Sequence, residues 1–194
     1  MSQGDLLRIL GYIWAVFGVY WIAVGSLVKV SQTHESAFYR LARLVVLAIT
    51  FALLFSDRIA VGPLGLRIVP PLPAIAYSGF GFALTGLALA LWARMHLGQY
   101  WSDKVVLKAD HQLIRSGPYA HMRHPIYSGV LLGVAGTALL VGEWRGLLAF
   151  TLLLTNYAVK AKKEEGILSA RFGDQFQEHV RHAGFLFPRF RTRS

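Results

Sequence analysis

The sequence contains no cysteine and few charged residues. Without cysteine the chain forms no disulfide bond and no thiolate metal site, and it gives no indication of a redox compartment. Histidine does not indicate a metal site either, because His121 and His124 have no carboxylate or cysteine partner at ligand spacing. Gly79-Phe80-Gly81 lacks the preceding strand and the third glycine of a dinucleotide-binding loop. These absences argue against disulfide scaffolds, metal enzymes and proteins with a Rossmann fold.

The scarcity of charge indicates a membrane protein. Only 15% of the 194 residues are charged, 55% are hydrophobic, and the mean hydropathy is +0.46. A soluble domain of this length carries more charge. No short apolar run ending at a small-residue cleavage site begins the chain, so we expect no removable signal peptide and a first apolar segment that is retained.

A helix needs about 20 apolar residues to cross a bilayer. The apolar segments that approach this length are Leu6–Val28, Leu41–Phe55, Leu72–Trp92, Ile126–Val141 and Gly146–Val159. The last two are short and closely spaced, which predicts a tight helical hairpin. Gly79, Gly81 and Gly86 predict a close approach of a neighbouring helix. The segments predict an all-α, polytopic membrane protein with five transmembrane helices.

The basic residues predict its orientation. Five crossings leave Arg8, Arg58, Arg67 and Arg145 on one side and all the other lysines and arginines on the opposite side. Cytoplasmic loops carry the excess of Lys and Arg, so we expect the amino terminus outside and the carboxyl terminus in the cytoplasm. Anionic cytoplasmic lipid then accounts for the formal net charge of +10 without a nucleic-acid partner.

Two polar segments fall on the cytoplasmic side and can meet there. One is the loop from His96 to Arg123, and the other is the tail from Lys160 onward. In the tail, Phe172, Phe176 and Val180 recur at helical spacing between charged residues. This pattern predicts an amphipathic helix on the membrane surface that ends near Gly184.

The stretch from Gly117 to Gly129 is the candidate site. It places an arginine, two histidines, two tyrosines and two prolines between apolar segments. Arg123 and His124 can also be read as a positive-inside anchor and a loop-packing histidine. Glu164 and Glu165, the only adjacent carboxylates, can be read as a solvated helix face with Lys160 one turn away.

An ordered set of motifs resembles the isoprenylcysteine carboxyl methyltransferase and phospholipid methyltransferase superfamily. The motifs are His111-Gln112-Leu113-Ile114, Gly117-x-Tyr119, Arg123-His124-Pro125-x-Tyr127-x-Gly129 and Glu164-Glu165. The resemblance covers about Leu97 to Pro188 and implies an integral membrane enzyme that binds S-adenosylmethionine without a Rossmann fold. It divides a single membrane domain, 1–194, into a three-helix part, 1–95, and a methyltransferase core, 96–194.

The resemblance also implies roles for individual residues. The implied cofactor-binding residues are His111, Gln112, Leu113, Ile114, Gly117, Tyr119, His124, Pro125, Tyr127 and Glu165. The implied catalytic residues are Arg123, Lys160 and Glu164, with no metal. Carboxyl methyltransferases of the superfamily carry an arginine about one turn before the operative glutamate, and this chain departs from them by having Lys160 there.

Three functions remain open at this point. A carboxylate acceptor, as on a prenylated cysteine, needs only a cation such as Arg123 or Lys160 to orient it. An amine acceptor of the phosphatidylethanolamine type needs Glu164 or Glu165 as a base. In either case we expect a lipophilic substrate that enters sideways from the bilayer. The third possibility is a non-enzymatic membrane scaffold or transporter subunit with a basic cytoplasmic face.

Overall fold

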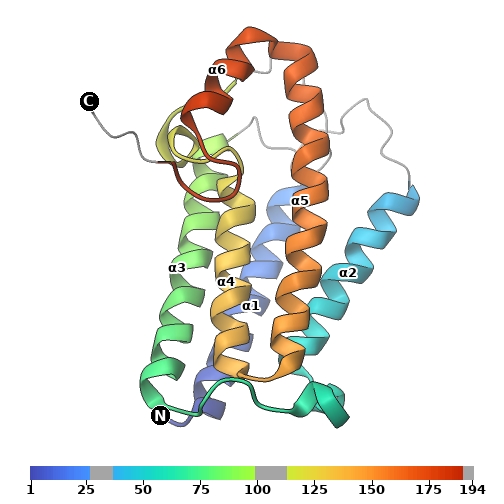
Figure 1. The fold of residues 1–194 in the computed structure, drawn as a ribbon, viewed down its shortest axis with the longest axis vertical. Coiled ribbons are helices and arrows are strands. Elements are labelled where there is room, and N and C mark those ends of the chain that lie inside the picture. Colours follow the sequence, from blue (N-terminus) through green and yellow to red (C-terminus); the bar gives the residue numbers. More distant parts are fainter. Residues whose placement is uncertain (27–36, 99–112, 190–194) are drawn as a thin grey trace.

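The described part of the chain is a bundle of helices. The structure, a computed structural model, describes residues 1–26, 37–98 and 113–189. Its α-helices are α1 (Gln3–Ser26), α2 (Ala37–Phe55), α3 (Pro73–Leu97), α4 (Pro125–Val141), α5 (Trp144–Phe172) and α6 (Asp174–His182). Helices α1, α3, α4 and α5 run along the long axis, α2 slants away from them, and the short α6 lies at one end (Figure 1). The described residues contain no named strand, so the prediction of an all-α fold is confirmed.

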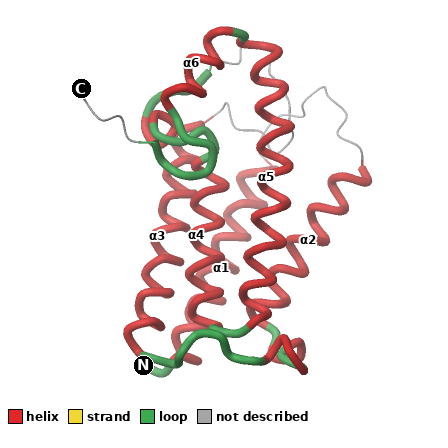
Figure 2. The backbone as a smooth tube through the Cα atoms, viewed as in Figure 1, coloured by secondary structure: helices red, strands yellow, loops and turns green. Residues whose placement is uncertain are grey.

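The connecting segments gather at the two ends of the bundle (Figure 2). At the end that holds the amino terminus lie the 3-10 turns η1 (Asp57–Ile59) and η2 (Gly62–Gly65) and the turn between α4 and α5. At the opposite end lie η4 (Gly117–Ala120) and α6. The division of loops between the two ends is the one that the apolar segments predict.

Proline and glycine set several of the helix boundaries. Pro73 and Pro125 are the first residues of α3 and α4, where proline's missing N–H removes no helical hydrogen bond. Gly142 ends α4 with a φ of +69°, in the left-handed region that favours glycine. Only Gly142 and Glu143 separate α4 from α5, so the predicted helical hairpin is confirmed.

Helices α3 and α4 approach closely along a line of glycines. A Cβ at Gly129 would lie 2.6 Å from the carbonyl oxygen of Gly86, and one at Gly79 would lie 2.7 Å from that of Gly136. The predicted packing roles of Gly79 and Gly86 are therefore confirmed. The prediction for Gly81 is wrong, because a Cβ there meets nothing within 4 Å. Two residues of helix turn Gly81 by about 200° away from the Gly79 face.

The end of the bundle that holds the amino terminus is fastened by a buried arginine. Arg145 Nε donates to Glu143 Oε2 at 2.6 Å, Nη1 donates to the Ser56 carbonyl at 3.0 Å, and Nη2 lies 3.3 Å from Asp57 Oδ1. A buried guanidinium is tolerated only when its donors are satisfied. Arg145 thereby ties the start of α5 to the chain that follows α2.

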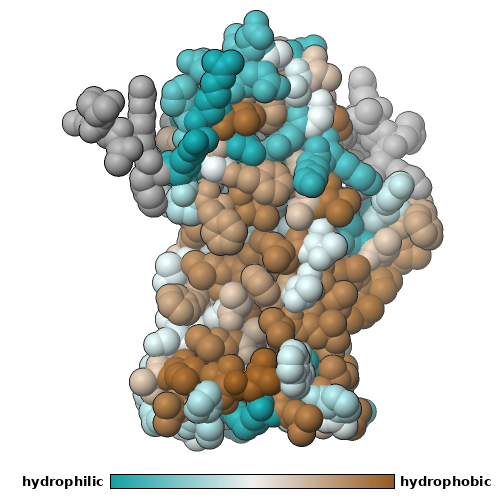
Figure 3. Space-filling view, viewed as in Figure 1, coloured by the Kyte–Doolittle hydropathy of each residue, from teal (hydrophilic) through white to brown (hydrophobic). Residues whose placement is uncertain are grey.

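The surface of the bundle is apolar along its length. Three helices, α1, α2 and α3, are long and apolar enough to cross a membrane, and α4 is a shorter apolar helix. Hydrophobic residues cover the middle of the visible face, and hydrophilic residues cover the end that carries α6 (Figure 3). This arrangement agrees with an integral membrane protein.

The tail differs from the predicted single amphipathic helix. Helix α5 continues without interruption through Lys160 to Phe172, and Gly173 then breaks the helix at a φ of +49°. Helix α6 turns back toward the loop before α4, and Phe176 is buried there. The prediction of one continuous helix in the tail is therefore wrong, whereas its predicted end near Gly184 is confirmed, since α6 ends at His182. The regular apolar spacing continues across Gly173 and conceals the break.

Candidate functional site

The loop before α4 and the chain after α6 are joined through their backbones. Met122 and Gly184 form a parallel bridge. Arg123 N donates to the Gly184 carbonyl at 2.8 Å, and Gly184 N donates to the His121 carbonyl at 3.0 Å. Ser128 Oγ, in the first turn of α4, also donates to the Leu186 carbonyl at 2.6 Å. Segments about 60 residues apart in the sequence are thus fixed side by side.

The two adjacent glutamates of α5 face the start of α4. Tyr127 Oη donates to Glu164 Oε1 at 2.5 Å. His124 lies between the two carboxylates, with Nδ1 3.5 Å from Glu164 Oε2 and Nε2 3.2 Å from Glu165 Oε1. Because α5 extends well past Val159, it carries this pair to the level of the loop. The expected meeting of loop and tail is present in the structure.

The surroundings of His124 favour its charged form. Burial lowers the pKa of His124, but hydrogen bonds to Glu164 and Glu165 and the charges of both carboxylates raise it by more, so the net shift is upward. Each ring nitrogen faces a carboxylate oxygen, and only the imidazolium can donate from both. A histidine cation between two carboxylates is the arrangement that follows.

Arg123 links the same cluster to the tail. Its Nε donates to Glu165 Oε1 at 2.5 Å, and its Nη1 donates to the Ala183 carbonyl at 2.6 Å. Burial raises the pKa of Glu165, but hydrogen bonds from His124 and Arg123 and their charges give a net lowering. Glu165 is therefore held as a carboxylate by two cationic side chains.

Aromatic rings surround the carboxylates. The Tyr127 ring stacks on His124 with centroids 5.5 Å apart, and its centroid lies 4.7 Å from that of Tyr157. Phe185 meets His124 edge-on at 5.4 Å. Lys160 Nζ lies 5.4 Å from the Tyr127 ring centroid and 4.0 Å from Glu164 Oε1. One face of α5 thus presents a carboxylate, an ammonium group and an aromatic ring to α4.

The turn η4 adds a second aromatic group beside this cluster. Gly117 has a φ of +58°, and a Cβ there would lie 2.7 Å from the His96 ring. The buried Tyr119 ring stacks on His96 at 6.4 Å and packs with Ile114 and Ile126. Burial raises the pKa of the Tyr119 hydroxyl, and the charge of Glu164 raises it further. Tyr119 therefore stays neutral beside the acidic pair.

Most residues that the sequence selects come together here. Six of them form one contact network: Arg123, His124, Tyr127, Lys160, Glu164 and Glu165. Tyr119 and Ile114 adjoin it, and Pro125 is buried as the first residue of α4. Leu113 is half-buried at the start of a described segment, whereas His111 and Gln112 lie outside the described residues.

Two aromatic members of the site were not predicted. Tyr157 stands seven residues before Glu164, so the helical period could have placed both on one face of α5. Phe185 carries no local signal, because its position depends on the break at Gly173 and the return of the chain through α6.

The chemistry of these side chains suits an organic cation beside an anion. Carboxylates and aromatic faces, here those of Glu164, Tyr119 and Tyr127, attract a cationic centre. Lys160 offers a positive charge to an anionic group at the same place. The arrangement can therefore hold two reactants of opposite charge next to each other.

Comparison with known proteins gives a consistent family. The model of the isoprenylcysteine carboxyl methyltransferase family matches residues 79–170. Protein-S-isoprenylcysteine O-methyltransferase of Schizosaccharomyces pombe is 34% identical over 105 residues, which are 53% of this chain and 44% of the relative. A probable protein-S-isoprenylcysteine O-methyltransferase of Oryza sativa subsp. indica is 30% identical over 118 residues, which are 58% of this chain and 62% of the relative.

A solved structure shares the fold. The eukaryotic intramembrane Ras methyltransferase ICMT superposes with a TM-score of 0.50 and 21% sequence identity. The match covers 81% of this chain and 54% of that one. The chain thus spans about half the length of the relatives that it matches. The segment matched by the family model, 79–170, contains α4, the loop before it and the acidic pair.

Proposed function

Because the chain belongs to the isoprenylcysteine carboxyl methyltransferase superfamily, we propose that it transfers a methyl group from S-adenosylmethionine to a lipophilic carboxylate at the membrane. The observation that carries this proposal is the network in which Tyr127, His124 and Arg123 hold Glu164 and Glu165. An isoprenylcysteine-type acceptor is the substrate class that the relatives' names support.

The residues fit the cofactor. A sulfonium favours aromatic faces and carboxylates, and an adenine ring needs an apolar slot. Tyr119, Tyr127 and Glu164 would face the sulfonium, and Glu165 would face the ammonium group of the cofactor. Ile114 and the turn at Gly117 would border the slot. When bound, S-adenosylmethionine supplies an electrophilic methyl group. Leu113, His111 and Gln112 complete the proposed cofactor-binding segment.

Each residue of the cluster has a separate role in the proposed reaction. His124 orients both carboxylates, and Pro125 fixes the first turn of α4 beside it. Glu164 faces the reacting groups together with Tyr127. Lys160 orients the acceptor carboxylate, since its ammonium group lies 4.0 Å from Glu164 Oε1. Arg123 acts as a positioning residue, because its donors hold Glu165 and the Ala183 carbonyl.

The lowered pKa of Glu165 favours a carboxylate over an amine acceptor. A carboxylate is already nucleophilic, whereas an ammonium must first lose a proton to a base. Cationic partners lower the pKa of Glu165, which makes it a weak base. Methylation of a phosphatidylethanolamine-type amine therefore remains the second candidate.

We extend the proposal to the placement in the membrane. All five long helices cross the bilayer, with the amino terminus outside and the site and carboxyl terminus in the cytoplasm. At 1.5 Å per residue, the 17 residues of α4 span about 25 Å, so the bilayer thins or the bundle tilts there. The 29 residues of α5 span about 43 Å, enough to carry the acidic pair beyond the hydrocarbon core. Residues 1–95 support the core, 96–194.

The test is methyl transfer by purified protein in detergent. With labelled S-adenosylmethionine, we expect methylation of a farnesylcysteine and little or none of phosphatidylethanolamine. Glu164→Ala should lower turnover at least a hundredfold, because it removes the partner of Tyr127 and Lys160. Glu178→Ala, an exposed glutamate of α6, is the matched control and should keep wild-type turnover. Equal loss in both variants, or a folded protein that methylates neither acceptor, contradicts the proposal.

A further inference from the structure

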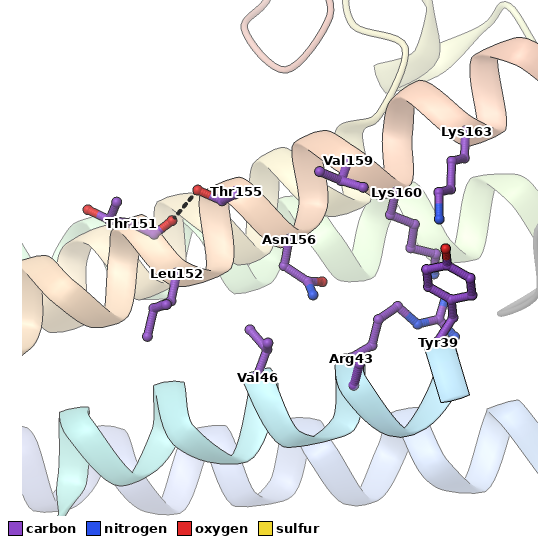
Figure 4. A pocket seen from close by; sticks show the side chains of 11 residues that line it. Tyr39, Arg43, Val46, Thr151, Leu152, Thr155, Asn156, Val159, Lys160 and Lys163 are labelled. Carbon is purple, nitrogen blue, oxygen red and sulfur yellow. Dashed lines mark hydrogen bonds between the residues drawn. The ribbon is translucent and has the colours of Figure 1, made fainter. Parts of the chain in front are cut away.

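A groove of about 360 Å³ lies between α2 and α5 (Figure 4). Its volume falls within the range of small-molecule sites. Lys160 lines the groove and also reaches Glu164, so the groove opens directly beside the candidate site. Its other wall, α2, lies outside the segment that matches the family. The groove therefore combines a wall inside the matched segment, α5, with a wall outside it, α2.

The groove has one basic end and one apolar end. Arg43, Lys160 and Lys163 line the basic end, where Lys163 Nζ lies 3.8 Å from the Tyr39 ring centroid. Figure 4 shows these side chains together, with Val46 and Leu152 farther along the groove. No carboxylate is among the described residues that line it. An amphiphile with an anionic head and a lipophilic chain matches this gradient, whereas an ammonium head is repelled.

A polar side chain lies between the basic end and the apolar end of the groove. Asn156 stands one helical turn before Lys160 and points from α5 into the groove (Figure 4). Within the described part of the chain its amide makes no hydrogen bond. A polar group in a stretch of helix that faces lipid is costly unless a partner satisfies it. The occupant should therefore carry a polar linkage near Asn156 when its anionic head lies near Lys160, one helical turn farther along α5.

We propose that this groove binds the acceptor itself: a lipophilic carboxylic acid whose carboxylate lies at Lys160, whose polar linkage meets Asn156 and whose chain lies along Val46 and Leu152. The inference rests on the proposed function for the methyl-transfer step alone. It assigns acceptor selection to α2 and α5, and it gives Arg43 and Lys163 the task of guiding the anionic head to Lys160.

Photolabelling tests the groove independently of methyl transfer. The probe is an N-acetylcysteine thioether with a farnesyl-length chain that carries a diazirine near its end, applied to full-length protein in detergent. We expect adducts near Val46 on α2 and near Leu152 on α5, displaced by unlabelled farnesylcysteine. Adducts confined to other helices overturn the proposal. Equal labelling by a phosphatidylglycerol probe that the farnesylcysteine does not displace also overturns it.

Matched variants sharpen the test. Val46→Trp fills the groove and should reduce labelling at least tenfold, whereas Ile49→Trp, on the exposed face of the same helix, should not. Leu152→Trp fills the groove from the other wall and repeats the test. Binding of S-adenosylhomocysteine should be unchanged in all three. Groove labelling without methyl transfer would contradict the proposed function but support acceptor binding in the groove. Methyl transfer without groove labelling would support the proposed function but contradict acceptor binding in the groove.

Discussion

His124 couples the charges of the site at the scale of single residues. It contacts both glutamates and stacks on Tyr127, so a change in its charge acts directly on these three side chains. Because the pKa of His124 is raised in the folded state, its protonation stabilises the fold at pH values below the ordinary pKa of 6.5. This contribution is lost as the pH rises through the raised pKa. The lowered pKa of Glu165 works in the opposite direction, since its contribution is lost as the pH falls below 4.5.

His179 gives a more measurable pH dependence. It is buried on α6, where burial first, and then the charges of Arg115, Arg123 and His182, lower its pKa from 6.5 to about 4. Between these values the unfolded chain binds a proton that the folded chain does not. Stability should therefore decrease as the pH falls from 6.5 to 4, by at most about 3 kcal/mol.

Thermal unfolding of detergent-solubilised protein at several pH values measures this effect. His179→Gln should flatten the profile between pH 6.5 and 4 relative to wild type, because glutamine does not titrate. Identical profiles for the two proteins in this range would show that His179 is not held neutral by its surroundings.

At the scale of elements, the glycine line between α3 and α4 sets how closely these helices pack. A Cβ at Gly86 would meet backbone atoms of Gly133 and Gly129, which cannot move aside as a side chain can. Gly86→Ala should therefore destabilise the bundle by about 1–3 kcal/mol.

Gly81→Ala on the same helix is the matched control. Its Cβ meets open space, and alanine favours helix over glycine by roughly 0.5–1 kcal/mol, so this variant should be neutral or slightly stabilised. Thermal midpoints of both variants in one detergent provide the comparison. Equal midpoints would mean that the interface between α3 and α4 has room for a methyl group at Gly86.

The elements also show how far the sequence alone leads. Apolar length and the close spacing of the last two apolar segments were enough to locate the long helices and the α4–α5 hairpin. The motif residues of the site were identifiable because their types and order are distinctive. The position of α6 could not be predicted, since Phe172 and Phe176 keep a helical spacing across Gly173. A break that depends on one glycine φ angle leaves no periodic signal, and Phe185 was missed for the same reason.

At the scale of the whole molecule, the two ends of the bundle should lie on opposite sides of the membrane. The chain has no cysteine, so single cysteines can be introduced without a background. A membrane-impermeant maleimide should label Arg58→Cys in intact cells, and Glu178→Cys only after permeabilisation. The reverse pattern would invert the proposed orientation, and labelling of both in intact cells would contradict an odd number of crossings.

Binding of S-adenosylhomocysteine tests most directly whether the joined loop and acidic pair form a cofactor site. Calorimetric titration of detergent-purified protein should give one site per chain in wild type and in Glu178→Gln. Glu165→Gln should weaken binding at least tenfold while its thermal midpoint shows that it remains folded. Folded wild-type protein that binds no S-adenosylhomocysteine, or equal affinity in Glu165→Gln, would contradict the assignment of this cluster.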